Sequence, residues 1–421
     1  MSEVQPKVVK KMLLRFVGGL FAIAIVLGLY SYWKSLGKNP DFGTADTRGC
    51  IAAVQLLSDG SSVAVLVKPD GSIEQAGGHT QGASDIDLVW RPDGNRLLFA
   101  SNRGGSAYNI YRWNPEANRV DKLTTGSRGQ GKPTFAEDDK ASGNQQALME
   151  SGGVIVQFDP VEGTRNQVLP FISRDVPTSQ DEGGDISQFE GLYGKLGKSF
   201  KVAYWIKNRS YIAAIMERES GEVLIIQNIK PTSANDAQPV PIVAGDHVQM
   251  AVNPTNGTVV YTVQGFQFPD PSNPPPGSVD KQGRIKLPFV NAIGEFDTDN
   301  PAASRVIAAS KDNAQAFSDP AVSPDGTSIA TVIGSISEMS FYPAGIVDFP
   351  MPPAASEQGA LIFKGPAHEP SWSPDGALIV FAMDGAGGHR GIYSLQKGGG
   401  QAKDLTGDKG DFEFPMVSPQ S

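Results

Sequence analysis

The sequence reads WRPDG at residues 90–94 and WSPDG at residues 372–376. With the two motifs aligned, three further landmarks coincide without a gap: Phe99 with Phe381, Ile110-Tyr111 with Ile392-Tyr393, and Leu123-Thr124 with Leu405-Thr406. A third copy of the turn, VSPDG, occupies residues 322–326. The chain is therefore built from a repeated unit, and the repeat decides how the rest is interpreted.

Each copy of the motif predicts a tight turn between two β-strands. Proline presets φ at the first central position, aspartate bonds its own backbone, and glycine accepts the exit geometry. The whole unit matches four antiparallel strands in about 45 residues, which is one propeller blade. The composition agrees, because 48 Gly, 31 Pro and only 19% charged residues suit short strands and many turns. We expect an all-β fold, a β-propeller.

The weaker copies indicate six or seven blades, with seven favoured. Segments that resemble the first strand of a blade, several with the pattern Pro-x-apolar, include Trp90, Phe135, Phe189, Val252, Val322, Trp372 and Val417. Their spacing is irregular in the middle of the chain. Six blades therefore remain possible if one middle segment is an insertion.

The two ends of residues 51–421 are predicted to share one blade. Residues 51–76 resemble the last three strands of a blade, and FPMVS at residues 414–418 resembles a first strand with no successors. Pairing these ends would close the ring and leave no free sheet edge. We therefore expect a propeller over residues 51–421 that is closed by its terminal strands.

The paired segments 90–124 and 370–406, with a partial copy at 320–332, resemble the TolB-like propeller repeats. The resemblance implies the fold. It implies no single function, because propellers of this family serve as protein-binding platforms and as lids over peptidase domains. This chain would be a membrane-anchored variant of the family.

The N-terminal segment predicts a membrane anchor. Residues 16–33 contain no charged residue, and a run of 18 at about 1.5 Å per residue nearly spans a hydrocarbon core. We divide the region into a cytoplasmic tail (1–11), a transmembrane helix (12–33) and a linker (34–50). The residues expected at the membrane interfaces are Arg15, Tyr30, Tyr32 and Trp33. The alternative is a cleaved signal peptide, but no small-x-small cleavage site follows the apolar run.

Charge sets the expected location and excludes one class of partner. Lysine and arginine gather before the apolar run, which favours a cytoplasmic N-terminus and a periplasmic propeller at a bacterial inner membrane. The net charge of −9 and the absence of a basic cluster outside the N-terminus argue against a nucleic-acid partner.

The residues offer no recognisable catalytic, cofactor or metal motif. Cys50 is the only cysteine, and the four histidines are far apart in the sequence. No Gly-x-Ser-x-Gly elbow is present. The aspartates of the turns, Asp70, Asp93, Asp325 and Asp375, are interpreted as turn formers. We therefore predict that the protein is not an enzyme.

Two Pro-rich insertions, 265–287 and 337–359, are the best candidates for contact with a partner. The second bears six apolar residues in a predicted loop: Phe341, Tyr342, Ile346, Val347, Phe349 and Met351. Apolar loops either pack on their own blade or bind a partner, and the sequence leaves both open.

Two functions remain after these exclusions. The leading hypothesis is a membrane-anchored scaffold that binds other proteins, as an accessory subunit of a transport, respiratory or light-harvesting complex. The alternative is a small-molecule or glycan-binding, or hydrolytic, propeller that uses its central channel. That alternative predicts polar side chains that converge at the ends of the first strands, and a pocket with carboxylates whose pKa values are shifted.

Overall fold

The structure is a computed structural model. It describes residues 46–136, 146–160, 164–170, 193–206, 209–232, 237–270, 274–282, 284–300, 304–351, 359–385 and 387–420. Within these ranges, no helix is long and apolar enough to cross a membrane. The predicted anchor over residues 12–33, with Arg15, Tyr30, Tyr32 and Trp33, lies outside the described residues.

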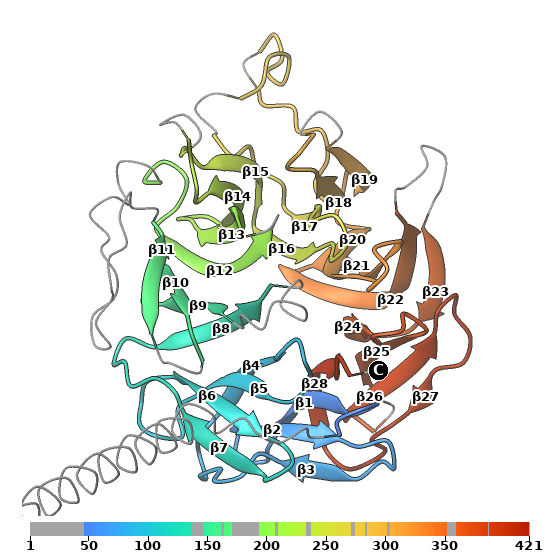
Figure 1. The fold of residues 1–421 in the computed structure, drawn as a ribbon. Coiled ribbons are helices and arrows are strands. Elements are labelled where there is room, and N and C mark those ends of the chain that lie inside the picture. Colours follow the sequence, from blue (N-terminus) through green and yellow to red (C-terminus); the bar gives the residue numbers. More distant parts are fainter. Residues whose placement is uncertain are drawn as a thin grey trace, which may run out of the picture. The chain divides into compact units, whose positions relative to one another are not determined.

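Residues 45–421 form one compact unit of seven four-stranded antiparallel sheets arranged in a ring (Figure 1). The fold is a seven-bladed β-propeller, so the favoured count is confirmed. The first blade combines β28 (Asp411–Val417) with β1 (Ile51–Leu56), β2 (Ser62–Val67) and β3 (Ile73–Gln75). The second contains β4 (Asp85–Trp90), β5 (Leu97–Ser101), β6 (Asn109–Asn114) and β7 (Arg119–Lys122).

The third and fourth blades follow in chain order. The third contains β8 (Gln130–Phe135), β9 (Ala147–Ser151), β10 (Val154–Phe158) and β11 (Arg165–Leu169). The fourth contains β12 (Ser199–Ile206), β13 (Tyr211–Glu217), β14 (Glu222–Asn228) and β15 (Val240–Gly245). The prediction that Phe189 marks the first strand of this blade is wrong, because β12 takes that place and Phe189 lies outside the described residues.

The last three blades complete the ring. The fifth contains β16 (His247–Val252), β17 (Val259–Gln264), β18 (Asn291–Phe296) and β19 (Arg305–Ser310). The sixth contains β20 (Ala316–Val322), β21 (Ser328–Ser337), β22 (Ser340–Pro350) and β23 (Ala360–Lys364). The seventh contains β24 (Ala367–Trp372), β25 (Leu378–Asp384), β26 (Arg390–Gln396) and β27 (Lys403–Asp404).

The hydrophobic core lies between the blades, because each sheet buries both of its faces. Along β1, Ala52 and Val54 pack against the second blade, whereas Ile51 and Ala53 pack against the seventh. Alternation of this kind follows from the two-residue period of a strand. Equivalent clusters fill every junction between neighbouring blades, so the described ring is packed all the way round.

The repeated motif has two structural roles. The aspartate of each turn accepts the N–H of the residue two positions on, as Asp325 does from Thr327 (3.0 Å) and Asp375 from Ala377 (3.0 Å). The tryptophan ties its blade to the preceding one. Trp90 Nε1 donates to the Met416 carbonyl and Trp372 Nε1 to the Ala321 carbonyl, each at 3.0 Å.

The terminal strands close the ring as one blade. Strand β28 pairs antiparallel with β1, from Ile51 opposite Val417 to Leu56 opposite Asp411. Beyond the ladder, Ser418 N donates to the Cys50 carbonyl at 2.9 Å. Strand β28 therefore pairs the C-terminal residues of the propeller with β1, its first strand in the sequence. This is the pairing that the sequence predicts.

Candidate functional site

Residues 337–350 of the predicted partner-binding segment 337–359 form a strand hairpin rather than a loop, and residues 352–358 lie outside the described residues. Strand β22 pairs with β21 along residues 340–350, and these strands contain 11 and 10 residues against 8 in β12, the next longest. Sequence reasoning failed because proline normally marks the end of a strand. Here Pro343 lies opposite Gly334, next to a β-bulge that accommodates it.

The pairing of β22 divides the six predicted residues into two groups. Ile346 is fully buried against the seventh blade, and Val347 (5% exposed) and Phe349 (4% exposed) are buried against the fifth. Met351 packs partly buried beside them. The prediction that these four residues contact a partner is corrected: they belong to the core between blades.

The tip of the β21–β22 hairpin is the part that remains exposed. Tyr342 is 52% exposed and Phe341 is partly buried. The sequence analysis missed Met339, which is 99% exposed in the turn that joins the two strands. A half-exposed tyrosine and a fully exposed methionine thus stand close together at the end of the longest hairpin in the described chain.

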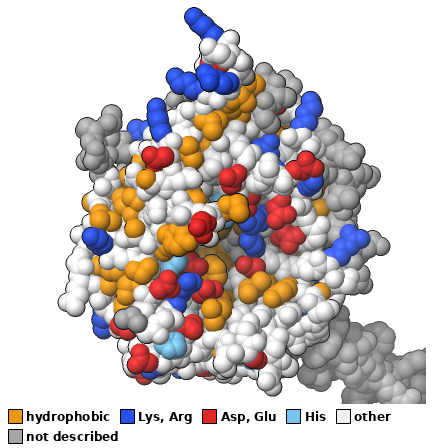
Figure 2. Space-filling view, turned by 180° about the vertical axis from the view of Figure 1, so that it is seen from behind, with side chains coloured by type: hydrophobic (Ala, Val, Ile, Leu, Met, Phe, Trp, Pro, Cys, Tyr) orange, Lys and Arg blue, Asp and Glu red, His pale blue; other side chains and the backbone are white. Residues whose placement is uncertain are grey.

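The hairpin tip lies on the face of the ring at which the innermost strands begin. Because the strands of each blade alternate in direction, the β21–β22 turn is on the same side as the first residues of β4, β16 and β24. We call this side the first-strand face. All four histidines lie at this side, and Figure 2 shows a face with histidines on which Asp/Glu and Lys/Arg side chains gather around the middle.

Each histidine on this face stands beside a carboxylate rather than beside another histidine. His368 Nε2 lies 3.1 Å from Asp384 and His389 Nδ1 lies 3.3 Å from Asp411. The other two pairs are longer, with His247 at 3.4 Å from Glu222 and His79 at 3.8 Å from Asp85. Among the described residues, no group of three or more His, Cys, Asp or Glu is placed to hold a metal ion.

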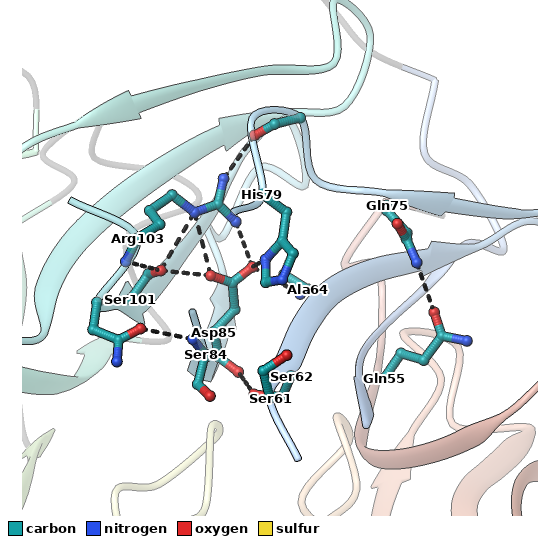
Figure 3. A network of polar contacts seen from close by, with 12 residues as sticks. Gln55, Ser61, Ser62, Ala64, Gln75, His79, Ser84, Asp85, Ser101 and Arg103 are labelled. Atoms are coloured by element: carbon teal, nitrogen blue, oxygen red, sulfur yellow. Dashed lines mark hydrogen bonds and ion pairs between the residues drawn. The ribbon is translucent and has the colours of Figure 1, made fainter. Parts of the chain in front are cut away.

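The cluster around Asp85 links two blades (Figure 3). Asp85 is fully buried, and its carboxylate accepts Ala64 N of the first blade (3.0 Å) and Ser101 Oγ of its own blade (2.6 Å). Arg103 forms an ion pair with the same carboxylate and donates to the Gly77 carbonyl at 2.6 Å. Because Ser101 donates to aspartate and not to His79, the cluster lacks the serine-to-histidine bond that a nucleophilic triad requires. The contacts that the cluster makes join the first blade to the second.

A second polar constellation lies at the centre of the ring, where the innermost strands meet (Figure 1). Five of these strands contain a β-bulge whose first residue has positive φ. We call these the bulge residues: Asp87, Lys132, Asp319, Glu369 and Phe414, with φ between 48° and 54°. Left-handed geometry in non-glycine residues is unfavourable and tends to occur at functional sites.

The bulge residues are connected from blade to blade. The Asp319 N–H donates to the Gln249 side chain at 2.7 Å, and the Glu369 N–H donates to the Asp319 carboxylate at 3.4 Å. The Phe414 N–H in turn donates to the Glu369 carboxylate at 2.5 Å. The side chains of Gln249, Asp319 and Glu369 thus each accept a backbone N–H from the innermost strand of the following blade. Lys132 N and the Asp87 carboxylate make the same contact at 3.1 Å.

Burial shifts the acidity of this centre. Desolvation raises the pKa of Glu369 to about 8, and the neighbouring Asp319 and Glu413 carboxylates add to the effect. Desolvation also raises the pKa of Asp87. Glu369 is therefore largely protonated at neutral pH, so its carboxyl group can donate a hydrogen bond as well as accept one. Phe414, 49% exposed, adds an aromatic ring to the same set.

The sequence analysis missed the bulge residues although the signal was present. Four of them directly precede the proline of a Pro-x-apolar segment: Lys132 before Pro133, Asp319 before Pro320, Glu369 before Pro370, and Phe414 before Pro415. Proline is tolerated in a strand where the ladder is interrupted, so it marks the second position of these four bulges. The residue before it is the one at the centre of the ring.

Comparison with known proteins shows the fold and no more. No family model and no curated protein matches the chain. Among solved structures it is similar to an oligogalacturonate lyase in complex with manganese, with a TM-score of 0.51 and 13% identity over 85% of each chain. It is also similar to a puromycin-hydrolysing peptidase of Mycobacterium tuberculosis, with a TM-score of 0.52, 9% identity and coverage of 86% of this chain.

This chain spans about half of that peptidase (53%). TolB of Acinetobacter baumannii matches with a TM-score of 0.48 and 12% identity over 89% of this chain and 68% of that one. The lyase and the peptidase are enzymes by name, but identities this low carry no function across. They support the propeller fold independently of the repeat.

Proposed function

We propose that the protein is a membrane-anchored, extracytoplasmic propeller that binds other proteins and serves as an accessory subunit of a membrane complex. The observation that supports the proposal is the β21–β22 hairpin, which ends in Met339 and Tyr342, 99% and 52% exposed. Methionine and tyrosine are enriched in protein interfaces, where they supply large contact areas. The hairpin holds them on a paired backbone, so little entropy is lost on docking.

The anchor and the periplasmic location belong to this proposal and rest on the sequence. Residues 16–33 have the length and composition of a membrane span, and the flanking charges favour a cytoplasmic N-terminus. A rigid ring attached to a membrane in this way is suited to bracing neighbouring proteins.

Site-specific crosslinking tests the docking surface directly. A photoreactive amino acid is placed at Met339 in the full-length protein and activated in the native membrane. The matched control carries it at Leu361, 57% exposed on β23 of the same blade. We expect one discrete crosslinked partner from position 339 and none from 361. Absence of any product at 339, or the same products at both positions, would contradict the docking surface.

The centre of the ring supports a second candidate function, the binding of a small polar ligand. What supports this candidate is that polar side chains converge there and that the pKa values of two carboxyl groups, Asp87 and Glu369, are raised. A protonated Glu369 beside Asp319 offers both a donor and an acceptor to a polyhydroxylated ligand such as a sugar.

Thermal-shift measurements with a panel of mono- and oligosaccharides test this candidate. A binding sugar raises the melting temperature of the wild type, and the rise disappears in Asp319→Asn. If no sugar in the panel moves the melting temperature at millimolar concentration, the candidate is rejected and the docking surface stands alone.

A further inference from the structure

The connection between β17 and β18 forms a second projecting element, which we call the arm: residues 274–282 and 284–288. Val279 and Ile285 pair across it as an antiparallel bridge. Lys286 N donates to the Ser278 carbonyl at 2.7 Å, and Asp280 N donates to the Arg284 carbonyl at 2.9 Å. The Asp280 carboxylate closes the turn by accepting Arg284 N at 2.8 Å. The arm is therefore a small hairpin with defined pairing.

The base of the arm is fixed to the ring by aromatic packing. Phe266 N donates to the Val290 carbonyl at 2.8 Å, which joins the two ends of the connection. The Phe266 ring lies 4.5 Å from Phe289 and 5.3 Å from Phe268, measured between centroids. Phe266 and Phe268 are 9% and 8% exposed within the core between the fourth and fifth blades. The base of the arm is thus fixed to the ring, and the arm itself projects from the ring (Figure 1).

One face of the arm is apolar and exposed. Residues directly opposite in an antiparallel pair, and residues two apart in one strand, share a face. Val279, Ile285 and Leu287 meet this condition, and they are 44%, 50% and 41% exposed. The exposed parts of these three aliphatic side chains are available for contact with something outside the ring.

The same arm is basic within an acidic protein. It carries Lys281, Arg284 and Lys286 against one acid, Asp280, whereas the whole chain has a net charge of −9. Arg284 pairs with Asp280 at 2.8 Å, and neither lysine forms an ion pair with the described residues. Figure 2 shows hydrophobic and Lys/Arg side chains together where this element projects at the top of the view.

We propose that the arm binds the headgroup region of an anionic lipid bilayer. Aliphatic side chains enter the acyl boundary while basic side chains stay with the anionic headgroups, which is the chemistry of an interfacial membrane contact. A protein partner fits less well, because lysine is depleted in protein interfaces and Leu and Val are under-represented among their energetic hot spots. The inference goes beyond the proposed function and does not depend on the β21–β22 hairpin.

Fluorescence labelling of the full-length protein tests the contact. Cys50 is only 5% exposed, so an environment-sensitive dye reacts selectively with a cysteine introduced as Leu287→Cys. The protein is reconstituted into phosphatidylcholine vesicles with or without phosphatidylglycerol. The matched control is Glu116→Cys, exposed in the β6–β7 turn on the opposite face of the ring.

In vesicles with phosphatidylglycerol, we expect the dye at 287 to shift to the blue and to be quenched by a spin-labelled lipid, whereas the dye at 116 stays water-like. The double substitution Lys281→Gln with Lys286→Gln should lower the equilibrium constant for binding of the arm to the bilayer surface by about 25-fold, about fivefold for each charge removed. Met339→Ser should leave the shift unchanged.

A water-like dye at 287 in both kinds of vesicle would overturn the proposal. An equal shift in pure phosphatidylcholine vesicles would overturn the claim that the arm requires anionic lipid. If the dye at 287 shifts to the blue only when a membrane extract is added, and still does so after lipid has been removed from the extract, the arm binds a protein instead of a bilayer. None of these outcomes bears on crosslinking at Met339, so failure of this inference and failure of the proposed function are distinguishable.

Discussion

Single residues at the centre of the ring have chemical properties that their neighbours in the sequence do not predict. The aspartates of the Pro-Asp-Gly turns were predictable, because the turn needs a side chain that bonds its own backbone, and Asp325 and Asp375 do so. Glu369 was not predictable. Its raised pKa depends on desolvation and on Asp319 and Glu413. These two residues are 50 and 44 positions away in the sequence, and only the closed ring brings them close to Glu369.

The pKa of Glu369 predicts a dependence of stability on pH. The folded pKa of about 8 lies above the unfolded value near 4.5, so the native state binds the extra proton between these values. This carboxyl group therefore costs stability progressively as pH rises from about 5 to 8. Glu369→Gln removes the cost, so its melting temperature relative to wild type should rise with pH over that window. A constant difference between pH 5 and 8 would contradict the protonated state.

Asp85 should be among the most sensitive single positions for stability. Asp85→Ala leaves the buried Arg103 guanidinium uncompensated, which we expect to lower the free energy of unfolding by about 3–5 kcal/mol. Asp375→Ala, at an exposed turn, removes ordinary hydrogen bonds and should cost about 1 kcal/mol. Urea titration measures both. Equal losses for the two variants would show that the Asp85 link is not a stabilising contact between blades.

At the scale of elements, the sequence predicted strands at the Pro-Asp-Gly turns and at the Pro-x-apolar segments, and it failed at Pro343, which belongs to neither pattern. Residues 337–359 were interpreted as a loop because of their prolines, yet β22 continues past Pro343 with a β-bulge at Ala344 of the same strand. No local pattern indicates that Pro343 continues a strand, since the outcome depends on the pairing of β22 with β21 on both sides of the bulge. The arm at 274–288 is, by contrast, an insertion between β17 and β18, as its Pro-rich composition indicated.

The division of β22 into a buried stretch and an exposed tip predicts opposite results for two substitutions. Ile346→Ala should destabilise the protein by about 2–5 kcal/mol, because it leaves a cavity between the sixth and seventh blades. Tyr342→Ser should change stability by less than about 0.5 kcal/mol. Chemical denaturation of the two variants measures the difference. A large loss for Tyr342→Ser would place that side chain in the core and remove it from any docking surface.

For the whole molecule, the repeat was informative because seven similar units can bury their sheets only against one another. The pairing that closes the ring could also be predicted from the sequence. Residues 414–418 resemble a first strand without successors, and residues 51–76 resemble the three strands that would complete the same blade. The position of the fourth blade was not, because its first strand, β12, lacks the Pro-x-apolar pattern.

Closure by β28 predicts that the last residues stabilise the entire ring. Deleting residues 411–421 removes the partner of β1, the buried Phe412 and the carbonyl that Trp90 binds. We expect the truncated chain to lose its cooperative thermal transition and to aggregate through the freed edge. Calorimetry with size-exclusion chromatography checks this outcome. A truncated chain that melts like the full one would mean that the ring does not depend on its closing strand.

The central claim, that the propeller is a protein-binding subunit at a membrane, is tested most directly by purifying the tagged full-length protein from its native membrane in mild detergent. Its mass on a sizing column and its bound proteins are compared with those of the Met339→Ser, Tyr342→Ser double variant. The account predicts a stoichiometric complex for the wild type and a lone 44.6 kDa chain for the folded variant. A wild type that elutes alone, or a variant that keeps every partner, would contradict it.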